Sequence, residues 1–149
     1  ITQKDNILIT GSTGAGKSYM ASAIGHQACS LGFKTMYFNT SKLFTMLKTS
    51  KADGSYLKQV NKIEKQDLLI LDDFGLKGLD TINRHSLMEI IEDRHGKKST
   101  IIASQLPVEA WHEIIGEQTI ADAILDRLVH TAHRIDIKGE SMRKKLKNK

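Results

Sequence analysis

The segment that most limits how this chain can fold is 11-GSTGAGKS-18. It matches the spacing G-x-x-x-x-G-K-[S/T] at every fixed position. An apolar, β-branched run precedes it at residues 6–10 (NILIT), and apolar side chains recur at helical spacing over residues 17–31. A strand, a glycine-rich loop and a helix in this order predict a loop that holds phosphate. Its backbone N–H groups can point into one concavity, and the helix adds the positive end of its dipole.

Two side chains at the end of this loop have specific expected roles. Lys17 can reach the β- and γ-phosphates of a nucleotide, and the Ser18 hydroxyl can bind Mg²⁺. ATP and Mg²⁺ are therefore the predicted cofactors. The predicted nucleotide-binding residues are Gly11, Ser12, Thr13, Gly14, Ala15, Gly16, Lys17, Ser18 and Tyr19.

A second apolar run, residues 68–71 (LLIL), ends in two adjacent carboxylates, Asp72 and Asp73. The run does not alternate, which predicts a strand buried on both faces, and we expect it beside the first strand. Asp72 would then hold Mg²⁺ through water, and Asp73 would orient or deprotonate the attacking water. Many ATPases of this kind have Glu at the second position, and Asp is one methylene shorter. An ordinary Asp-rich turn is the alternative for Asp73.

Two more positions are candidates for catalysis. A further apolar run at residues 100–103, the fourth along the chain, is followed by Ser104 and Gln105. A polar side chain there would lie between the phosphates and the acids. Gln105 is the preferred water-positioning residue, although Ser, Gln and Pro also form ordinary loops. Arg127 ends an apolar helical face. It is either a surface partner of Asp126 or Asp122 or an arginine finger for a neighbouring subunit.

Apolar runs at residues 6–10, 34–38, 68–71, 100–103 and 133–137 alternate with helical patterns. Strands alternating with helices predict right-handed βαβ units. The expected fold is a three-layer α/β P-loop NTPase with a central five-stranded parallel sheet, as one domain over residues 1–149. We expect Thr40 or Ser41 to cap the second helix, Asp80 to cap a later one, and Trp111 to serve packing.

Charge and composition add weaker constraints. The net charge is +5 and the basic excess is uneven, with one lysine cluster at residues 48–65 and a basic tail over residues 139–149. These patches suggest nucleic acid, although a solvated face explains them equally well. No apolar run reaches the roughly 18 residues of a membrane span. Cys29 is the single cysteine, so no internal disulfide can form. We expect Cys29 to be buried and the protein to be cytoplasmic.

Together these segments resemble AAA+ ATPases, and more narrowly the IstB-like ATP-binding helpers of insertion-sequence transposition, which are related to DnaC-like helicase loaders. The resemblance is carried, in order, by NILITGSTGAGKSYMASAIG, DLLILDDFGLKGLD, STIIASQLPVEAWHEIIGE and ADAILDRLVHTAHRIDIKGESMR. It implies an ATPase that is weak alone and stimulated by DNA and by self-association. It also implies ring or helical assembly on duplex DNA and recruitment or stimulation of a transposase.

The resemblance also implies residue roles. Asp72 and Asp73 match the Walker B pair, Gln105 or Ser104 the sensor-1 position, Arg127 the arginine finger and Arg143 a sensor-2-like arginine. The lysines on the side facing DNA would be Lys48, Lys51, Lys58 and Lys62.

The chain departs from the family pattern in two respects. The N-terminal domain that usually contacts the partner is not in this sequence, and neither is a separate C-terminal helical lid. The main alternative is a helicase loader that uses ATP as a switch. A P-loop kinase of small molecules ranks last, because its arginine-rich lid has no counterpart among the few scattered arginines.

Overall fold

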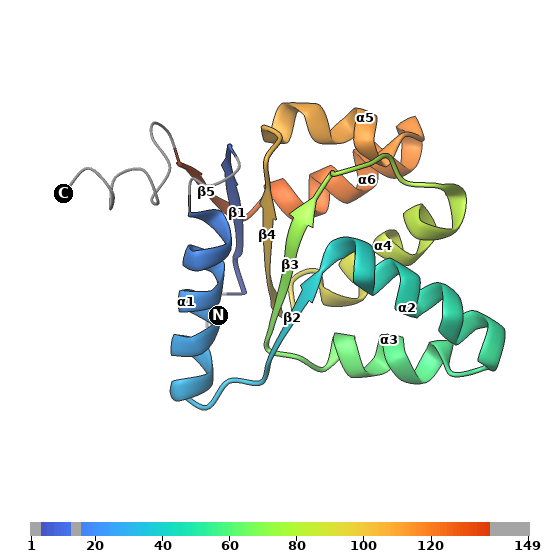
Figure 1. The fold of residues 1–149 in the computed structure, drawn as a ribbon, viewed down its shortest axis with the longest axis horizontal. Coiled ribbons are helices and arrows are strands. Elements are labelled where there is room, and N and C mark those ends of the chain that lie inside the picture. The colour runs from blue at the N-terminus through green and yellow to red at the C-terminus, as the bar shows by residue number, and fades with distance from the viewer. Residues whose placement is uncertain (1–3, 13–15, 138–149) are drawn as a thin grey trace.

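The computed structural model of the protein describes residues 4–12 and 16–137. Within these residues strands and helices alternate along most of the chain (Figure 1). The elements are β1 (Asn6–Gly11), α1 (Lys17–Ser30), β2 (Thr35–Asn39), α2 (Thr40–Asp53), α3 (Tyr56–Glu64), β3 (Leu68–Phe74), α4 (Thr81–Arg94), β4 (Ser99–Ser104), the 3₁₀ turn η1 (Val108–Ala110), α5 (Trp111–Ile115), α6 (Gln118–Val129) and β5 (Ala132–Ile137).

The five strands form one sheet in the order β2-β3-β4-β1-β5. Every neighbouring pair is parallel. The predicted fold class is therefore confirmed. One expectation is wrong, because β3 does not lie beside β1: β4 separates them, pairing with β3 on one side and β1 on the other. β4 is buried along its whole length, as β3 nearly is. Because both strands suit the middle of the sheet, burial patterns alone do not give their order.

The sheet has α1 on one face and the other helices on the opposite face (Figure 1). Side chains of β3 alternate between the two layers. Leu68 and Ile70 belong to the apolar cluster that contains Ala21 of α1. Leu69 and Leu71 belong to the larger cluster beneath the remaining helices. This alternation fixes which face each residue of β3 reaches, and it continues toward the acids at the end of the strand.

Two helix caps test the sequence predictions. Asp80 caps α4 as expected, because its carboxylate accepts a hydrogen bond from the Asn83 amide at 2.8 Å. The cap of α2 was predicted one or two residues too late. Asn39 is the cap, and its side-chain oxygen accepts from the Lys42 amide at 3.2 Å. Asn, Ser and Thr are all good caps, so the three adjacent candidates were not separable by residue type.

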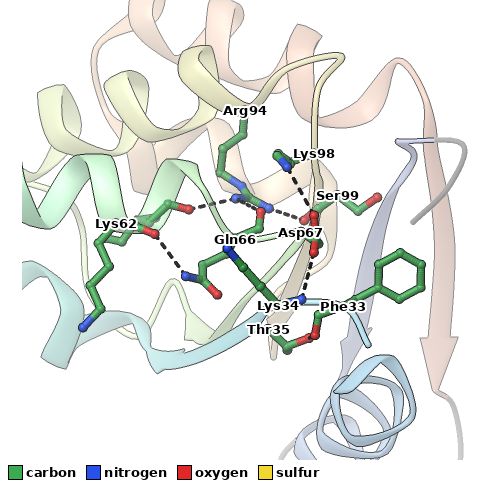
Figure 2. A network of polar contacts seen from close by, with 10 residues as sticks. Phe33, Lys34, Thr35, Lys62, Gln66, Asp67, Arg94, Lys98 and Ser99 are labelled. Carbon is green, nitrogen blue, oxygen red and sulfur yellow. Dashed lines mark hydrogen bonds and ion pairs between the residues drawn. The ribbon is translucent and has the colours of Figure 1, made fainter. Parts of the chain in front are cut away.

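Arg94 forms hydrogen bonds with several segments at the edge of the sheet where the strands begin (Figure 2). This guanidinium is only 1% exposed. It donates to the carbonyl oxygens of Ile63, in the last turn of α3, and Gln66, just after that helix, at 2.9 and 2.7 Å. It also donates to the Ser99 carbonyl at 2.5 Å and to Thr100 Oγ1 at 3.1 Å, at the start of β4. Burial lowers the pKa of Arg94 to about 10, so it stays charged at neutral pH.

Trp111 has the packing role predicted for it. Its side chain is fully buried, and its ring lies edge-on to Phe74 with centroids 5.0 Å apart. Its indole N–H donates to the Leu106 carbonyl at 3.0 Å, which satisfies the polar end of the ring.

Cys29 is exposed, so the expectation of a buried thiol is wrong. The buried line of α1 passes through Ala21, Gly25 and Ala28. Each helical residue is rotated by about 100° from the last, so Cys29 turns away from the sheet. Separately, no helix in the described part of the chain is long and apolar enough to cross a membrane.

Candidate functional site

The sheet brings the predicted site residues to one edge. Because all five strands are parallel, the loop after β1, the acids at the end of β3 and the end of β4 lie at the same carboxyl edge. This edge is where ligands bind in open α/β sheets. Because β4 lies between β1 and β3, its last residue, Ser104, lies between the loop that follows β1 and the acids at the end of β3.

The described part of the glycine-rich loop leads directly into α1. Gly16 is the N-cap, with φ of 99°, a left-handed conformation that favours glycine. Lys17 is only 6% exposed, and its ammonium donates to the Ser12 carbonyl at 3.0 Å. The ammonium therefore points back across the loop, where it can meet an anion. Ser18 and Tyr19 are exposed at the start of α1, whereas Thr13, Gly14 and Ala15 lie outside the described residues.

Asp72 is 2% exposed and firmly oriented. Its Oδ1 accepts from the Asp73 amide at 2.9 Å, and its Oδ2 accepts from the Tyr37 hydroxyl. Its carbonyl oxygen accepts from the Thr40 hydroxyl at 2.6 Å. Both carboxylate oxygens thus have a donor, which holds the carboxylate in one orientation.

Tyr37 links this acid to the start of α1. Its phenol donates to Asp72, and Ser18 is close enough to affect the pKa of the phenol. Burial, and then the hydrogen bond to Asp72, raise the pKa of Tyr37 above its usual value, while Ser18 opposes this. The phenol therefore remains a hydrogen-bond donor at neutral pH. Tyr37 thus contacts one of the two predicted Mg²⁺ ligands and lies near the other.

Asp73 lies at an irregularity in β3. The register with β4 shifts between Leu71 and Phe74, and Asp73 has a φ of 56°. Asp73 lines a cavity with Thr40 and Phe44 of α2, on the face that alternation along β3 gives it. The irregularity then returns Phe74 to that same face. Asp tolerates the left-handed conformation better than most residues. The Asn39 amide then donates to Asp73 Oδ2 at 3.1 Å and holds the carboxylate.

A small cavity lies beside Asp73. Its volume is about 80 Å³, and its walls include Thr40, Phe44, Lys48 and Gly75. A water molecule needs only some 10–15 Å³ on this measure, so several fit. The cavity gives the carboxylate room for water, which the expected general-base role requires.

The two candidates at the end of β4 differ in burial and in hydrogen bonding. Ser104 is fully buried, its hydroxyl donates to the Phe74 carbonyl at 2.6 Å, and it accepts from the Leu106 amide at 3.1 Å. This hydroxyl shapes the turn after β4. Gln105 is exposed and remains the side chain able to reorient toward a ligand.

Arg127 lies at the opposite edge from the loop. It shares a small surface pocket with Asn6 and Thr100, at the starts of β1 and β4. Its guanidinium contacts Glu92 of α4 at 2.5 Å and donates to the Ala123 carbonyl at 3.0 Å. Neither suggested partner, Asp126 or Asp122, is the acid that it contacts. The strand separating it from its own loop spans roughly 16 Å, so Arg127 does not reach the phosphate loop of its own chain.

The four lysines proposed for DNA are not equivalent. Lys48 forms an ion pair with Asp80, and the Lys51 ammonium lies 4.7 Å from the centroid of the Tyr56 ring. Lys58 and Lys62 are exposed on α3, four residues apart and therefore on one side of the helix. Arg143 and the basic tail lie outside the described residues.

Tyr37 and Asn39 are the site residues that sequence reasoning missed. Both come from β2, which pairs with β3 so that Asn39 lies opposite Asp72. The available signal was the polar end of the segment TMYFN, since every parallel strand of such a sheet ends at the site edge.

The donor set fits a magnesium nucleotide. Ser18 and Asp72 offer hydroxyl and carboxylate oxygens, which Mg²⁺ prefers, and Tyr37 contacts Asp72 and lies near Ser18. Lys17 and the start of α1 supply positive charge and backbone donors for phosphate. Asp73 is the acid with water-sized space beside it.

Comparison with known proteins agrees with this geometry. A family model described as IstB-like ATP binding protein matches residues 1–149. The chain is similar to a putative insertion sequence ATP-binding protein of Sinorhizobium fredii, with 52% identity over 149 residues, covering 100% of this chain and 61% of that protein. It is also similar to the insertion sequence IS21 putative ATP-binding protein of Pseudomonas aeruginosa, with 30% identity over 149 residues, covering 100% and 56%. The chain thus spans about three fifths of the length of these relatives.

Two solved structures show the same fold. The DnaC helicase loader superposes with a TM-score of 0.76 at 23% identity, covering 91% of this chain and 80% of that chain. DnaI superposes with a TM-score of 0.81 at 23% identity, covering 91% and 74%. At these identities the likeness establishes the fold alone.

Proposed function

Because the chain belongs to the family of IstB-like ATP-binding proteins, we propose that it binds ATP with Mg²⁺ at the carboxyl edge of its sheet and hydrolyses the nucleotide. We propose further that it assembles on duplex DNA and recruits or stimulates a transposase, as one ATPase core domain in the cytoplasm. The observation that best supports the ATPase is that Tyr37 contacts Asp72 and lies near Ser18, while Asp73 lines a cavity with room for water.

Each residue then has a distinct task. The loop backbone and Lys17 bind the phosphates, and Ser18 and Asp72 hold the cation. Mg²⁺, when bound, supplies positive charge for the phosphoryl group being transferred. Asp73, held by Asn39, accepts a proton from water in the adjoining cavity. Gln105 orients that water from the end of β4.

The arginine finger, if Arg127 provides it, must come from a neighbouring molecule, because Arg127 lies at the far edge of its own sheet. Arg127→Ala should therefore retain ATP binding and lose turnover by about 10³-fold or more. The ion pair with Glu92 leaves a matched control, Glu92→Gln, which removes the intramolecular partner but keeps the arginine. ATP turnover per molecule, measured against protein concentration with and without duplex DNA, is the test. Turnover per molecule that stays flat on dilution would exclude a finger in trans.

The DNA surface that we propose is centred on Lys58 and Lys62 of α3, which are exposed, whereas Lys48 and Lys51 contact Asp80 and Tyr56. Replacing both Lys58 and Lys62 by alanine should weaken binding to any duplex sequence. If each contacts a phosphate, the salt dependence, d log K/d log[salt], becomes less steep by about 2. Lys42→Ala, which replaces an exposed lysine at the start of α2, at the carboxyl edge of the sheet, is the control. An unchanged salt dependence in the double variant would place the DNA elsewhere.

The protein partner can be identified independently of the ATPase activity. Pull-down of the chain with a transposase and with a replicative helicase distinguishes the transposition helper from the helicase-loader alternative. Retention of the transposase alone is the expected outcome.

A further inference from the structure

Tyr37 occupies a position that the ATPase described above does not explain. It lies on β2, the edge strand of the sheet, opposite Ile70 of β3. Ile70 belongs to the apolar cluster on the α1 side, so the neighbouring Tyr37 reaches toward the start of α1. There its hydroxyl donates to Asp72 Oδ2, and Ser18 is close enough to affect the pKa of the phenol. A single phenol is thus adjacent to both residues proposed as cation ligands, which come from α1 and β3.

We propose that Tyr37 is a positioning residue for Mg²⁺: its hydroxyl holds the Asp72 carboxylate toward Ser18, so that the cation meets two oxygen ligands already in place. This inference rests on the proposed magnesium–ATP function and adds a residue to it.

The orientation of Asp72 shows why the phenol matters. The Asp73 amide fixes Oδ1 at 2.9 Å, and the Thr40 hydroxyl fixes the backbone carbonyl at 2.6 Å. Because the carboxylate is planar, the bond to Oδ1 already limits its rotation, but it holds only one of the two oxygens. The Tyr37 hydroxyl is the donor described for Oδ2, so with it the carboxylate is held at both oxygens and keeps one rotation about its last bond. Partners that orient metal ligands typically change metal affinity by about 10- to 100-fold when removed.

The hydroxyl can be removed with little effect on packing. The Tyr37 side chain is 47% exposed on the edge strand, and Phe keeps its ring. Tyr37→Phe is therefore expected to fold normally and to lose only the hydrogen bond to Asp72. Tyr56→Phe is a matched control, because the Tyr56 phenol also donates to a carboxylate, that of Glu89 at 2.8 Å. That pair joins α3 to α4 and contains no residue of the proposed nucleotide site.

The test is a MgCl₂ titration at a fixed concentration of a fluorescent, non-hydrolysable ATP analogue, with bound analogue followed by anisotropy. Tyr37→Phe should need about 10-fold more Mg²⁺ for half-saturation, with unchanged affinity for the analogue in EDTA and an unchanged melting temperature. Tyr56→Phe should titrate as the wild type does. Either an unchanged or a lowered Mg²⁺ requirement in Tyr37→Phe overturns the positioning role.

A double-mutant cycle distinguishes a specific effect of Tyr37 on Asp72 from a general effect on folding. In an Asp72→Asn background the carboxylate that Tyr37 orients is gone, so adding Tyr37→Phe should not raise the Mg²⁺ requirement further. An equal increase in both backgrounds contradicts the inference, because the phenol would then act independently of Asp72. Failure of the proposed function looks different: the wild type itself would bind the analogue without any dependence on Mg²⁺, or not at all.

Discussion

Asp73→Asn is expected to bind ATP about as well as the wild type and to lose roughly 10²- to 10⁴-fold in turnover. The amide has nearly the shape of the carboxylate and also tolerates the left-handed backbone at this position, where φ is 56°. Its oxygen can still accept the hydrogen bond from Asn39. What is lost is the ability to take a proton from water.

Steady-state phosphate release and equilibrium binding of an ATP analogue separate the two effects. Asp122→Asn, an exposed acid of α6 that pairs with His112, is the matched control and should keep full turnover. Unchanged turnover in Asp73→Asn would make Asp73 only the residue that forms the bulge. The missing methylene relative to Glu would then have no catalytic consequence.

Arg94→Met is expected to lower the free energy of unfolding by about 3–5 kcal/mol, because acceptors at this edge lose their donor. Methionine matches the length of the arginine stem but donates nothing. The carbonyl oxygens of Ile63, Gln66 and Ser99 would lose a charged donor, and that of Ile63 keeps another, the Gln66 amide. Each buried acceptor left without a partner costs about 1–3 kcal/mol. The loss concentrates where α3, β3 and β4 meet (Figure 2).

Urea unfolding measures this loss, provided that the m-value, the slope of the unfolding free energy against urea concentration, is the same in both proteins. Arg134→Met removes an exposed arginine that pairs with Glu109, and should cost under about 1 kcal/mol. Arg94→Lys keeps the charge without the planar set of donors, so its cost should fall between the two. An Arg94→Met protein no less stable than Arg134→Met would show that the buried network contributes nothing net.

The fold was predictable because its signals are local. Each strand of the sheet is a short apolar run, and the buried line of each long helix repeats at helical spacing. The order of strands was not predictable in the same way. β3 and β4 are both almost wholly buried, so their apolar patterns do not show that β4 lies between β1 and β3.

The site was predictable where one segment carries its own geometry, as the glycine-rich loop does. It was not predictable where it depends on strand pairing. Tyr37 and Asn39 reach Asp72 and Asp73 only because β2 pairs with β3 in one register. The register shift at Asp73 is likewise invisible in the residue pattern, since two consecutive aspartates fit a plain turn equally well.

The stabilising role of Arg94 was likewise not predictable from the sequence. A lone arginine at the end of a helix looks like a surface residue, since a charged side chain is rarely fully buried. Its burial follows from three separate segments, the end of α3, the residues before β3 and the start of β4, which each present a backbone oxygen to it.

The most direct test of the central claim uses Asp73→Asn as a trap for the ATP-bound form. Sedimentation velocity of this variant with duplex DNA and Mg²⁺ should show a multimer on DNA when ATP is present. Without ATP, or when Lys17→Ala is added, only small complexes should remain. A DNA-bound multimer of the same size with and without ATP would contradict the proposal that nucleotide binding at this loop drives assembly on DNA.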